Sequence, residues 1–253
     1  MVFIALLNGK TLIYDNIIST ARAKDDNKMK TRDRIIHAAL ALFNEHGEPN
    51  VTTNHIAADL GISPGNLYYH FRNKEQIIHC IFDQYAIDLK VSFEPVDVAE
   101  AIEASLLRYL DAVFLLMWRY RFFYANLPDI LRRDAALQNK YLAVQTQLQV
   151  NISQIMINFR DAGLLALADV DLKVLADTLK LVASSWISYQ TTQVAGAKIT
   201  QTVIYHGVQQ MLNIVRPLAT ELGQQRVTTL QHYYLEQEQQ YLEQQQKITT
   251  SEL

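Results

Sequence analysis

Residues 51–71 read VTTNHIAADLGISPGNLYYHF, and this stretch decides the fold of the N-terminal part of the chain. It contains two helix starts in quick succession. Thr52 can cap the first helix, which ends at Gly61. Ser63 can cap the second, with Pro64 at its first position, where an amide proton has no partner inside the helix. The stretch therefore predicts two short helices joined by a tight turn.

An apolar-periodic segment precedes this pair of helices, and another follows it. Residues 31–46 carry apolar side chains at helical spacing, and a longer helix is predicted from Lys74 to about Lys90. Residues 31–72 are thus predicted to form three short helices, the last two separated by a turn of about four residues. This is the helix-turn-helix pattern of DNA-binding proteins.

The second helix of the pair has the side chains that a DNA-reading helix needs. Such a helix places its N-terminal end in the major groove, with its backbone close to the duplex. Gly65 leaves room for that approach, and Tyr68, Tyr69 and His70 can donate to phosphates or touch base edges. The alternative is that one of the two tyrosines is a half-buried core residue whose hydroxyl is satisfied internally.

The run from Val51 to Ile78, in which LYYHF is followed closely by a lysine and a glutamate, resembles the DNA-binding domain of the tetracycline-repressor (TetR) family of bacterial regulators. The resemblance covers about residues 31–78. It implies an all-α homodimer with a small N-terminal DNA-reading domain and a larger C-terminal domain for ligand binding and dimerisation. It also implies DNA contacts from Thr53, Ser63, Gly65, Asn66, Tyr68, Tyr69, His70 and Lys74. Family members often carry a polar or basic residue where Pro64 stands, so no base contact is carried over to that position.

The amino-acid composition limits the classes of protein to which the chain can belong. With 8 glycines and 5 prolines in 253 residues, long helices are seldom interrupted. The single cysteine, Cys80, excludes an internal disulfide framework and favours the cytoplasm. No apolar run reaches the ~20 residues of a membrane span, so no membrane partner is expected. The net charge of −3 does not indicate nucleic-acid binding, but Lys28, Lys30, Arg32 and Arg34 crowd one short segment.

We expect four segments along the chain. Residues 1–28 are predicted to be a flexible extension or the result of a misplaced start, with Met29 replacing Met1. The alternative is a basic arm that lies along DNA phosphates. The other segments are a helix-turn-helix domain with its connecting helix at 29–90, an effector-binding and dimerisation domain at 91–222, and a C-terminal helix and tail at 223–253 that frays after Gln246.

The predicted helices of the larger domain are 97–120, a short one opened by Pro128, then 136–161, 171–193 and 199–219. The last two are apolar on more than one face, and such helices are buried on more than one side. Because one helix-turn-helix reads only a half-site, we expect them to pair with a second copy of the chain. The alternative is a monomer that buries both. The candidate interface residues are Leu175, Leu179, Val182, Val203, Val208, Met211, Leu212 and Val215.

The family resemblance also implies a small-molecule effector bound in the larger domain. Helical bundles can hold pockets lined by aromatic side chains and methionines. The candidates are Phe114, Met117, Trp118, Phe122, Phe123, Tyr124, Leu127, Tyr141, Met156 and Trp186. Ordinary core packing is the alternative explanation for each of them.

We therefore predict a sequence-specific DNA-binding transcriptional regulator, namely a homodimeric repressor released from its double-stranded operator by a small, largely apolar effector. An activator, or a partner-controlled regulator without a small ligand, is the alternative, because repression and activation differ only in operator position. A helical-bundle enzyme is the third interpretation. It is disfavoured because no paired-aspartate motif lies within a helix and GxSxG, HExxH, GxGxxG and P-loop motifs are missing. No catalytic residue, metal or cofactor is expected.

Overall fold

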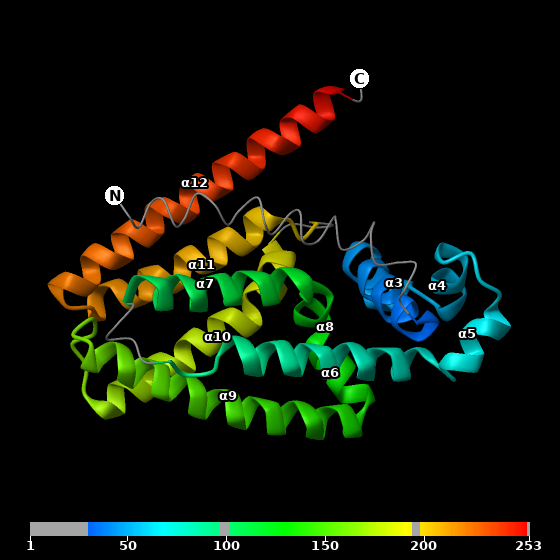
Figure 1. Cartoon of the computed structure of the whole chain (residues 1–253), viewed down its shortest axis with the longest axis horizontal. Coiled ribbons are helices and arrows are strands. Elements are labelled where there is room, and N and C mark those ends of the chain that lie inside the picture. The colour runs from blue at the N-terminus through cyan, green and yellow to red at the C-terminus, as the bar shows by residue number, and fades with distance from the viewer. Residues whose placement is uncertain (1–29, 97–101, 194–197, 252–253) are drawn as a thin grey trace. The chain divides into compact units, whose positions relative to one another are not determined.

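The computed structural model describes residues 30–96, 102–193 and 198–251, and these ranges are mostly helical (Figure 1). The predicted extension, and the choice between Met1 and Met29, lie outside the described residues. The helices are α3 (Thr31–His46), α4 (Thr53–Asp59), α5 (Pro64–His70), α6 (Lys74–Ser92), α7 (Ile102–Arg119), α8 (Arg121–Arg133), α9 (Ala135–Asp161), α10 (Asp169–Gln193), α11 (Gln201–Val215) and α12 (Glu221–Ser251), with short 3-10 helices η1 (Glu48–Asn50) and η2 (Arg216–Leu218). The predicted all-α fold is confirmed.

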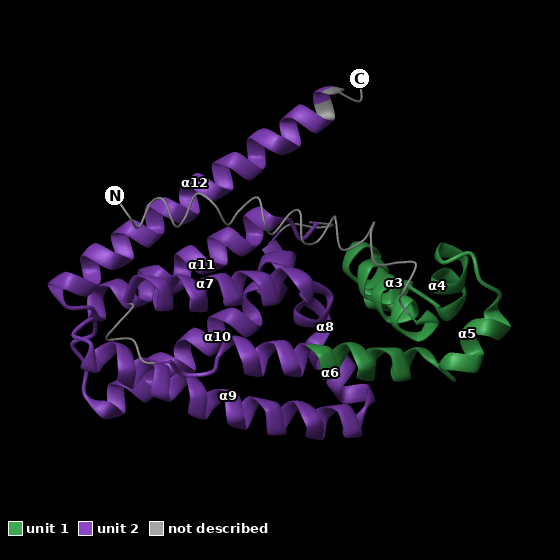
Figure 2. Cartoon of the chain, viewed as in Figure 1, with its two compact units in different colours: residues 1–84 green, residues 85–253 purple. Residues whose placement is uncertain are grey.

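The chain divides into two compact units, residues 1–84 and 85–253 (Figure 2). The division falls inside α6, between Gln84 and Tyr85, whereas the sequence placed it after Lys90. α6 is unbroken from Lys74 to Ser92. The C-terminal helix, which the sequence set apart as residues 223–253, belongs to the second unit.

The core of the first unit draws on α3, α4, α5 and α6. Ile35 and Phe43 from α3, Ile56 from α4, Leu67 from α5 and Ile77 from α6 have no exposed surface. Full burial of an aliphatic or aromatic side chain contributes about 1.5–3 kcal/mol. This shared core holds α4 and α5 together as a pair and leaves their other faces in solvent.

The turn between α4 and α5 depends on a glycine and two caps. Gly61 has φ 63°, in the left-handed region that side chains disfavour, and its N–H donates to the carbonyl of Ala58. Ser63 Oγ accepts the N–H of Asn66 at 3.2 Å, and Pro64 is the first helical residue of α5. The predicted caps and turn of the helix-turn-helix are therefore present in the structure.

The second unit is a bundle centred on α10 and α11. α10 packs against α8, α9 and α11, and α11 also packs against α7 and α12. Ile187 of α10 and Val208 of α11 are fully buried. The two helices approach closely at Gly207, where an added Cβ would lie 2.7 Å from Cδ1 of Trp186. The Trp186 Nε1–H donates to the carbonyl of Val203 at 2.7 Å and closes this contact.

Helix α8 corrects the prediction that Pro128 opens a helix. α8 begins at Arg121, and Pro128 lies inside it. A proline in a helix interior removes one backbone hydrogen bond and disfavours the turn before it. Phe122 and Phe123 before the proline and Ile130 after it are all buried, so apolar packing on both sides keeps the helix continuous.

Helix α12 is 31 residues long and continues past Gln246, where the sequence predicted fraying. Its first half is anchored in the bundle through Leu230 and Tyr234, which are buried. Tyr234 donates its hydroxyl proton to Asp111 Oδ1 at 2.8 Å. From Leu242 onward, the described side chains are exposed.

Candidate nucleic-acid interface and ligand cavity

The open face of α5 collects most of the residues predicted to contact DNA. Ser63, Gly65 and Asn66 are exposed, and Tyr69 is 85% exposed. Tyr68 is 49% exposed, so of the two tyrosines it is the closer to the half-buried tyrosine that was the alternative prediction. An added Cβ at Gly65 would meet only Ser63 Oγ, at 3.9 Å, so no protein atom crowds this end of the helix.

Tyr68 and Thr53 join the two helices of the pair. Their hydroxyl oxygens lie 3.1 Å apart, and either can be the donor. Each hydroxyl has acceptor capacity beyond this bond. Two predicted phosphate contacts from different helices are thus presented side by side. Tyr69 stands apart, with its ring edge against the ring of His70 at a centroid distance of 5.1 Å.

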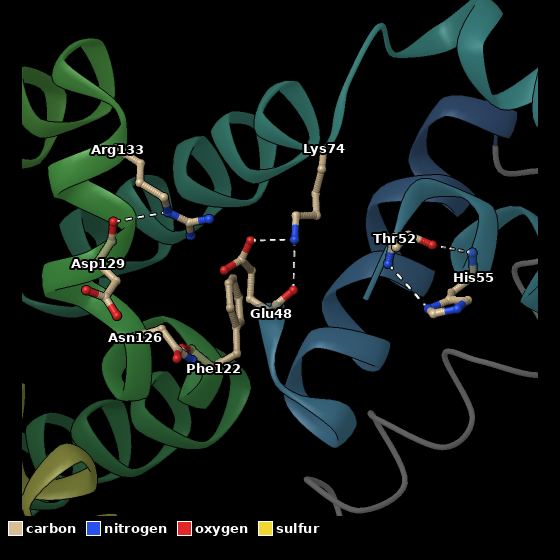
Figure 3. A network of polar contacts seen from close by, with 8 residues as sticks. All are labelled: Glu48, Thr52, His55, Lys74, Phe122, Asn126, Asp129 and Arg133. Atoms are coloured by element: carbon tan, nitrogen blue, oxygen red, sulfur yellow. Dashed lines mark hydrogen bonds and ion pairs between the residues drawn. The ribbon is translucent and has the colours of Figure 1, made fainter. Parts of the chain in front are cut away.

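The start of α4 is fixed by a reciprocal cap that the sequence showed only in part. The His55 N–H donates to Thr52 Oγ1 at 3.2 Å, and the Thr52 N–H donates to His55 Nδ1 at 3.4 Å (Figure 3). Thr52 was recognised as a cap, but the role of His55 was not. The arrangement holds Thr53, the next residue, at a fixed place on the exposed end of α4.

Lys74, which is also predicted to contact DNA, forms an ion pair inside the first unit. Its Nζ lies 2.8 Å from Oε1 of Glu48 and donates to the Glu48 carbonyl oxygen at 2.9 Å (Figure 3). The Glu48 side chain is fully buried, and the Lys74 side chain is 18% exposed. Because a buried carboxylate is strongly destabilising without a counter-charge, the ammonium is held inside the unit. A phosphate contact from Lys74 would require it to leave Glu48.

The basic segment before α4 is also partly used inside the protein. The Arg32 guanidinium donates to Cys80 Sγ at 2.9 Å and lies 4.8 Å from the centroid of the Phe71 ring. Lys30 is exposed, and Lys28 lies outside the described residues. Of this basic cluster, Arg32 thus has partners inside the protein.

The second unit contains a cavity of about 170 Å³. Its walls come from α6 to α12 and are mostly apolar. Six of the ten predicted pocket residues line it, namely Met117, Phe123, Tyr124, Leu127, Tyr141 and Met156. Four do not, namely Phe114, Trp118, Phe122 and Trp186. Phe114 packs on the ring of Tyr205, and Trp118 lies under the guanidinium of Arg121. Aromatic residues occupy more than one face of α7 and α8, so residue type alone could not separate lining from packing.

Three tyrosines of the cavity wall, Tyr85, Tyr109 and Tyr124, are neutral and hydrogen-bonded to the protein. The hydroxyls of Tyr85 and Tyr124 lie 3.3 Å apart. Burial raises the pKa of Tyr124 to about 12 and raises that of Tyr85 as well. The Tyr109 hydroxyl donates to the carbonyl of Glu94 at 3.0 Å. These groups supply dipoles to the wall and no charge.

The sequence analysis missed the other polar residues of the cavity, which are Gln145, Lys180, Ser184 and Arg226. The spacing along α10 could have indicated two of them. Lys180 directly follows Leu179, and Ser184 directly follows Ala183 one turn later, so both lie beside a face that lines the cavity. Burial lowers the pKa of Lys180, and the nearby Asp177 carboxylate partly opposes this.

Most residues predicted for a dimer interface lie in the interior of their own unit. Leu175, Leu179, Val208, Met211 and Leu212 are buried, and Leu179, Met211, Leu212 and Val215 line the cavity. Val182 and Val203 are half-buried. The exposed apolar residues of α10 are Val170, Val174, Leu181 and Tyr189. The first three lie on the opposite face of the helix from Leu179, and Tyr189 lies between the two faces. α10 is thus apolar on two faces, as expected, but its open face has different residues from those predicted.

Within the described ranges, no helix combines the length and apolar character needed to span a membrane. In the same ranges, no cluster of three histidine, cysteine or acidic side chains is placed to hold a metal ion.

Comparison with known proteins accounts for both units. Residues 35–81 match the family described as bacterial regulatory proteins, tetR family. Residues 84–227, more than half of the chain, match the family described as TetR, bacterial transcriptional repressor. The chain belongs to the TetR family. It is therefore a transcriptional regulator and not an enzyme. The members of this family bind DNA operators and function as dimers.

Individual TetR-family relatives resemble the chain over different lengths. The crystal structure of a TetR-family regulator from Marinobacter aquaeolei VT8 is 35% identical, with a TM-score of 0.70, and covers 81% of this chain and 99% of that one. The uncharacterized helix-turn-helix regulator TtgW from Pseudomonas putida is 33% identical over 94 residues, which are 37% of this chain and 70% of the relative. The regulator SrpR, also from Pseudomonas putida, is 33% identical over 85 residues, 33% of this chain and 40% of SrpR.

Proposed function

We propose that this TetR-family regulator is a homodimeric repressor that reads a twofold operator with α4 and α5. A small, largely apolar effector that enters the cavity of the second unit releases it from the DNA. The observation that carries the proposal is the course of α6. One uninterrupted helix contributes Ile77 and Ile81 to the core of the first unit and Tyr85 and Leu89 to the wall of the cavity.

The DNA-reading role rests on the exposed end of α5. In the proposal, Thr53, Ser63 and Tyr68 contact phosphates, and Asn66, Tyr69 and His70 lie toward the base edges. These side chains are small donors or rigid aromatic rings, which suit contact with a groove. Lys74 is left out of this set because of its ion pair with Glu48.

Release by an effector follows from the same helix. An effector that displaces Tyr85 or Leu89 moves part of α6, and the N-terminal half of the same helix is packed into the core of the DNA-reading unit. If the occupied cavity favours a dimer with a different separation of its reading helices from the roughly 34 Å of two half-sites, DNA affinity falls by the difference in binding energy.

The dimer of the proposal forms through the open face of α10. Val170, Val174, Leu181 and Tyr189 are each more than half exposed and lie on one side of this helix. A stripe of large apolar side chains in solvent is typical of an interaction surface. Pairing with a second copy would cover it and supply the twofold symmetry that a palindromic operator needs.

The test is a gel shift on the DNA that flanks the protein's own gene, at a fixed salt concentration, with the mass of the free protein measured by sedimentation. We expect a dimer and a sequence-specific shift. Tyr69→Ala should abolish the shift without unfolding the protein, because this ring is 85% exposed. Tyr241→Ala, the same change in α12, is the control. A version that starts at Met29 tests whether the first 28 residues are needed.

Two results would contradict the proposal. One is a folded monomer at concentrations well above those used for DNA binding. The other is a Tyr69→Ala protein that shifts the same DNA as strongly as the wild type.

A further inference from the structure

We infer that the ligand of the cavity is a small amphiphilic carboxylic acid, with its apolar body inside the cavity and its carboxylate paired with Lys180. This inference rests on the proposed function in one respect, which is that the cavity in the second unit is the effector site.

The cavity suits an apolar body of limited size. Its wall is formed mainly by leucine, valine, isoleucine, methionine and aromatic side chains. Its volume of about 170 Å³ is close to that of the roughly 150 Å³ apolar cavities known to take up benzene. By that scale it has room for a chain or ring of about six to eight carbon atoms.

Lys180 gives this apolar wall a positive charge. It lies on α10 between two other lining positions, Leu179 and Ala183, and is half-buried. Among the described residues, no hydrogen bond or ion pair within bonding distance reaches its ammonium. Asp177, one turn earlier, acts on it only through its field. Burial lowers the pKa of Lys180, because the charged form is less well solvated here than in water.

Several other polar groups of the wall have partners within the protein. The charge of the second cation, Arg226, is paired with Glu103 at 2.8 Å, although its buried Nε has no hydrogen-bond partner among the described residues. Ser184 Oγ donates to the carbonyl of Leu181 at 3.1 Å. The hydroxyls of Tyr85, Tyr124 and Tyr109 are bonded as described above. Lys180 is therefore the cation of this wall that has no ion-pair partner within bonding distance, within the part of the chain that the structure describes.

The charge selects the chemistry of the ligand. A carboxylate restores to the ammonium the solvation that the wall withholds, and a charge-assisted hydrogen bond is about twice as strong as a neutral one. A neutral alcohol of the same length fills the cavity equally well but supplies only a neutral acceptor. One open lysine matches one negative charge. The structure thus favours a monoanionic acid over a neutral hydrocarbon, and over a phosphate ester with its higher charge.

The test uses two matched pairs of ligands on the purified full chain, in calorimetric titrations near neutral pH. Octanoate is compared with octan-1-ol, and 3-phenylpropanoate with 3-phenylpropan-1-ol, which separates alkyl from aromatic acids. We expect at least one acid to bind about tenfold to a hundredfold more tightly than its alcohol, the range for a hydrogen bond to a charged group. In Lys180→Met the acid and the alcohol should bind alike. Lys173→Met, an exposed lysine on the same helix, should keep the preference.

The outcomes separate this inference from the proposed function. If the alcohols bind as tightly as the acids, or if Lys180→Met keeps the preference for the acid, the assignment of Lys180 is overturned. If the wild type binds none of the four, the inference fails as well. The gel shift is then repeated with neutral apolar compounds. Release of the DNA by such a compound keeps the proposed function, and no release by any compound that enters the cavity counts against both. Thermal unfolding of Lys180→Met, with alcohol binding intact, shows that the variant is folded.

Discussion

The ion pair between Lys74 and Glu48 makes a prediction in which stability and DNA binding separate. Lys74→Met removes the positive charge 2.8 Å from a carboxylate with no exposed surface. Removal of one partner from a buried pair destabilises a protein by about 3–5 kcal/mol. Domains of this kind are stable by about 5–15 kcal/mol in total, so the first unit should unfold at a much lower urea concentration.

The assay is urea unfolding followed by circular dichroism, with Lys90→Met as control. Lys90 lies on the same helix but is exposed, so its substitution should change the free energy of unfolding by no more than about 0.5 kcal/mol. The double variant Glu48→Leu with Lys74→Met replaces the pair by apolar side chains. It should recover most of the lost stability, because apolar replacements of buried pairs are often neutral.

The double variant then tests DNA binding in a folded protein. A lysine on a phosphate contributes about 0.9 to the slope of log affinity against log salt concentration. Because Lys74 is held by Glu48, we expect the slope to be unchanged. If Lys74→Met unfolds at the wild-type urea concentration and the slope falls by about one contact, Lys74 lies on DNA as the family resemblance implied, and our reasoning from the ion pair is refuted.

Two further predictions concern the second unit. Gly207→Ala should lower the free energy of unfolding by about 1–3 kcal/mol in urea titrations, because its Cβ would lie 2.7 Å from Trp186 Cδ1. Gly65→Ala, whose Cβ would meet only Ser63 Oγ at 3.9 Å, is the control. A Gly207→Ala midpoint equal to that of the wild type would show that α10 and α11 can separate freely. Burial raises the pKa of Tyr124 from 10.0 to about 12, so the unfolded chain loses this proton first and the free energy of unfolding should fall as pH rises from about 10 to 12. Tyr124→Phe should reduce this slope and leave the part due to Tyr85, whereas an identical slope would place the ionisation elsewhere.

Local signals in the sequence were sufficient for the DNA-reading half of the fold. Helix caps and helix-breaking residues act over three or four residues. The cap Ser63, the first-turn Pro64 and the turn glycine Gly61 could therefore be recognised from the sequence alone. The partner of Lys74 could not be found in this way. Glu48 lies 26 positions earlier in a short connector, and only the tertiary fold brings the two together.

Residues of the larger unit were harder to assign for a related reason. α10 is apolar on two faces. The periodicity of its apolar residues indicates that both faces are covered, but it does not indicate which of them faces the interior of the unit. Leu175 and Leu179 were therefore proposed for an interface that Leu181 and Tyr189 are better placed to form. The prediction that Pro128 begins a helix used only the local preference of proline for a first helical position. In the structure, buried apolar residues on both sides of the proline keep α8 continuous through it.

The unbroken course of α6 across the boundary has a consequence for hybrid regulators made by exchanging one unit between relatives. Each residue added to or removed from an α-helix turns everything beyond it by about 100°. A junction inside α6 that shifts the count by one would change by that angle the direction of Ile77 and Ile81 about the helix axis relative to Tyr85 and Leu89, while both units stayed folded. Such a hybrid would bind its DNA and its ligand and yet fail to connect them. Recombination between members of the family is thus restricted, at this helix, to joints that keep the residue count.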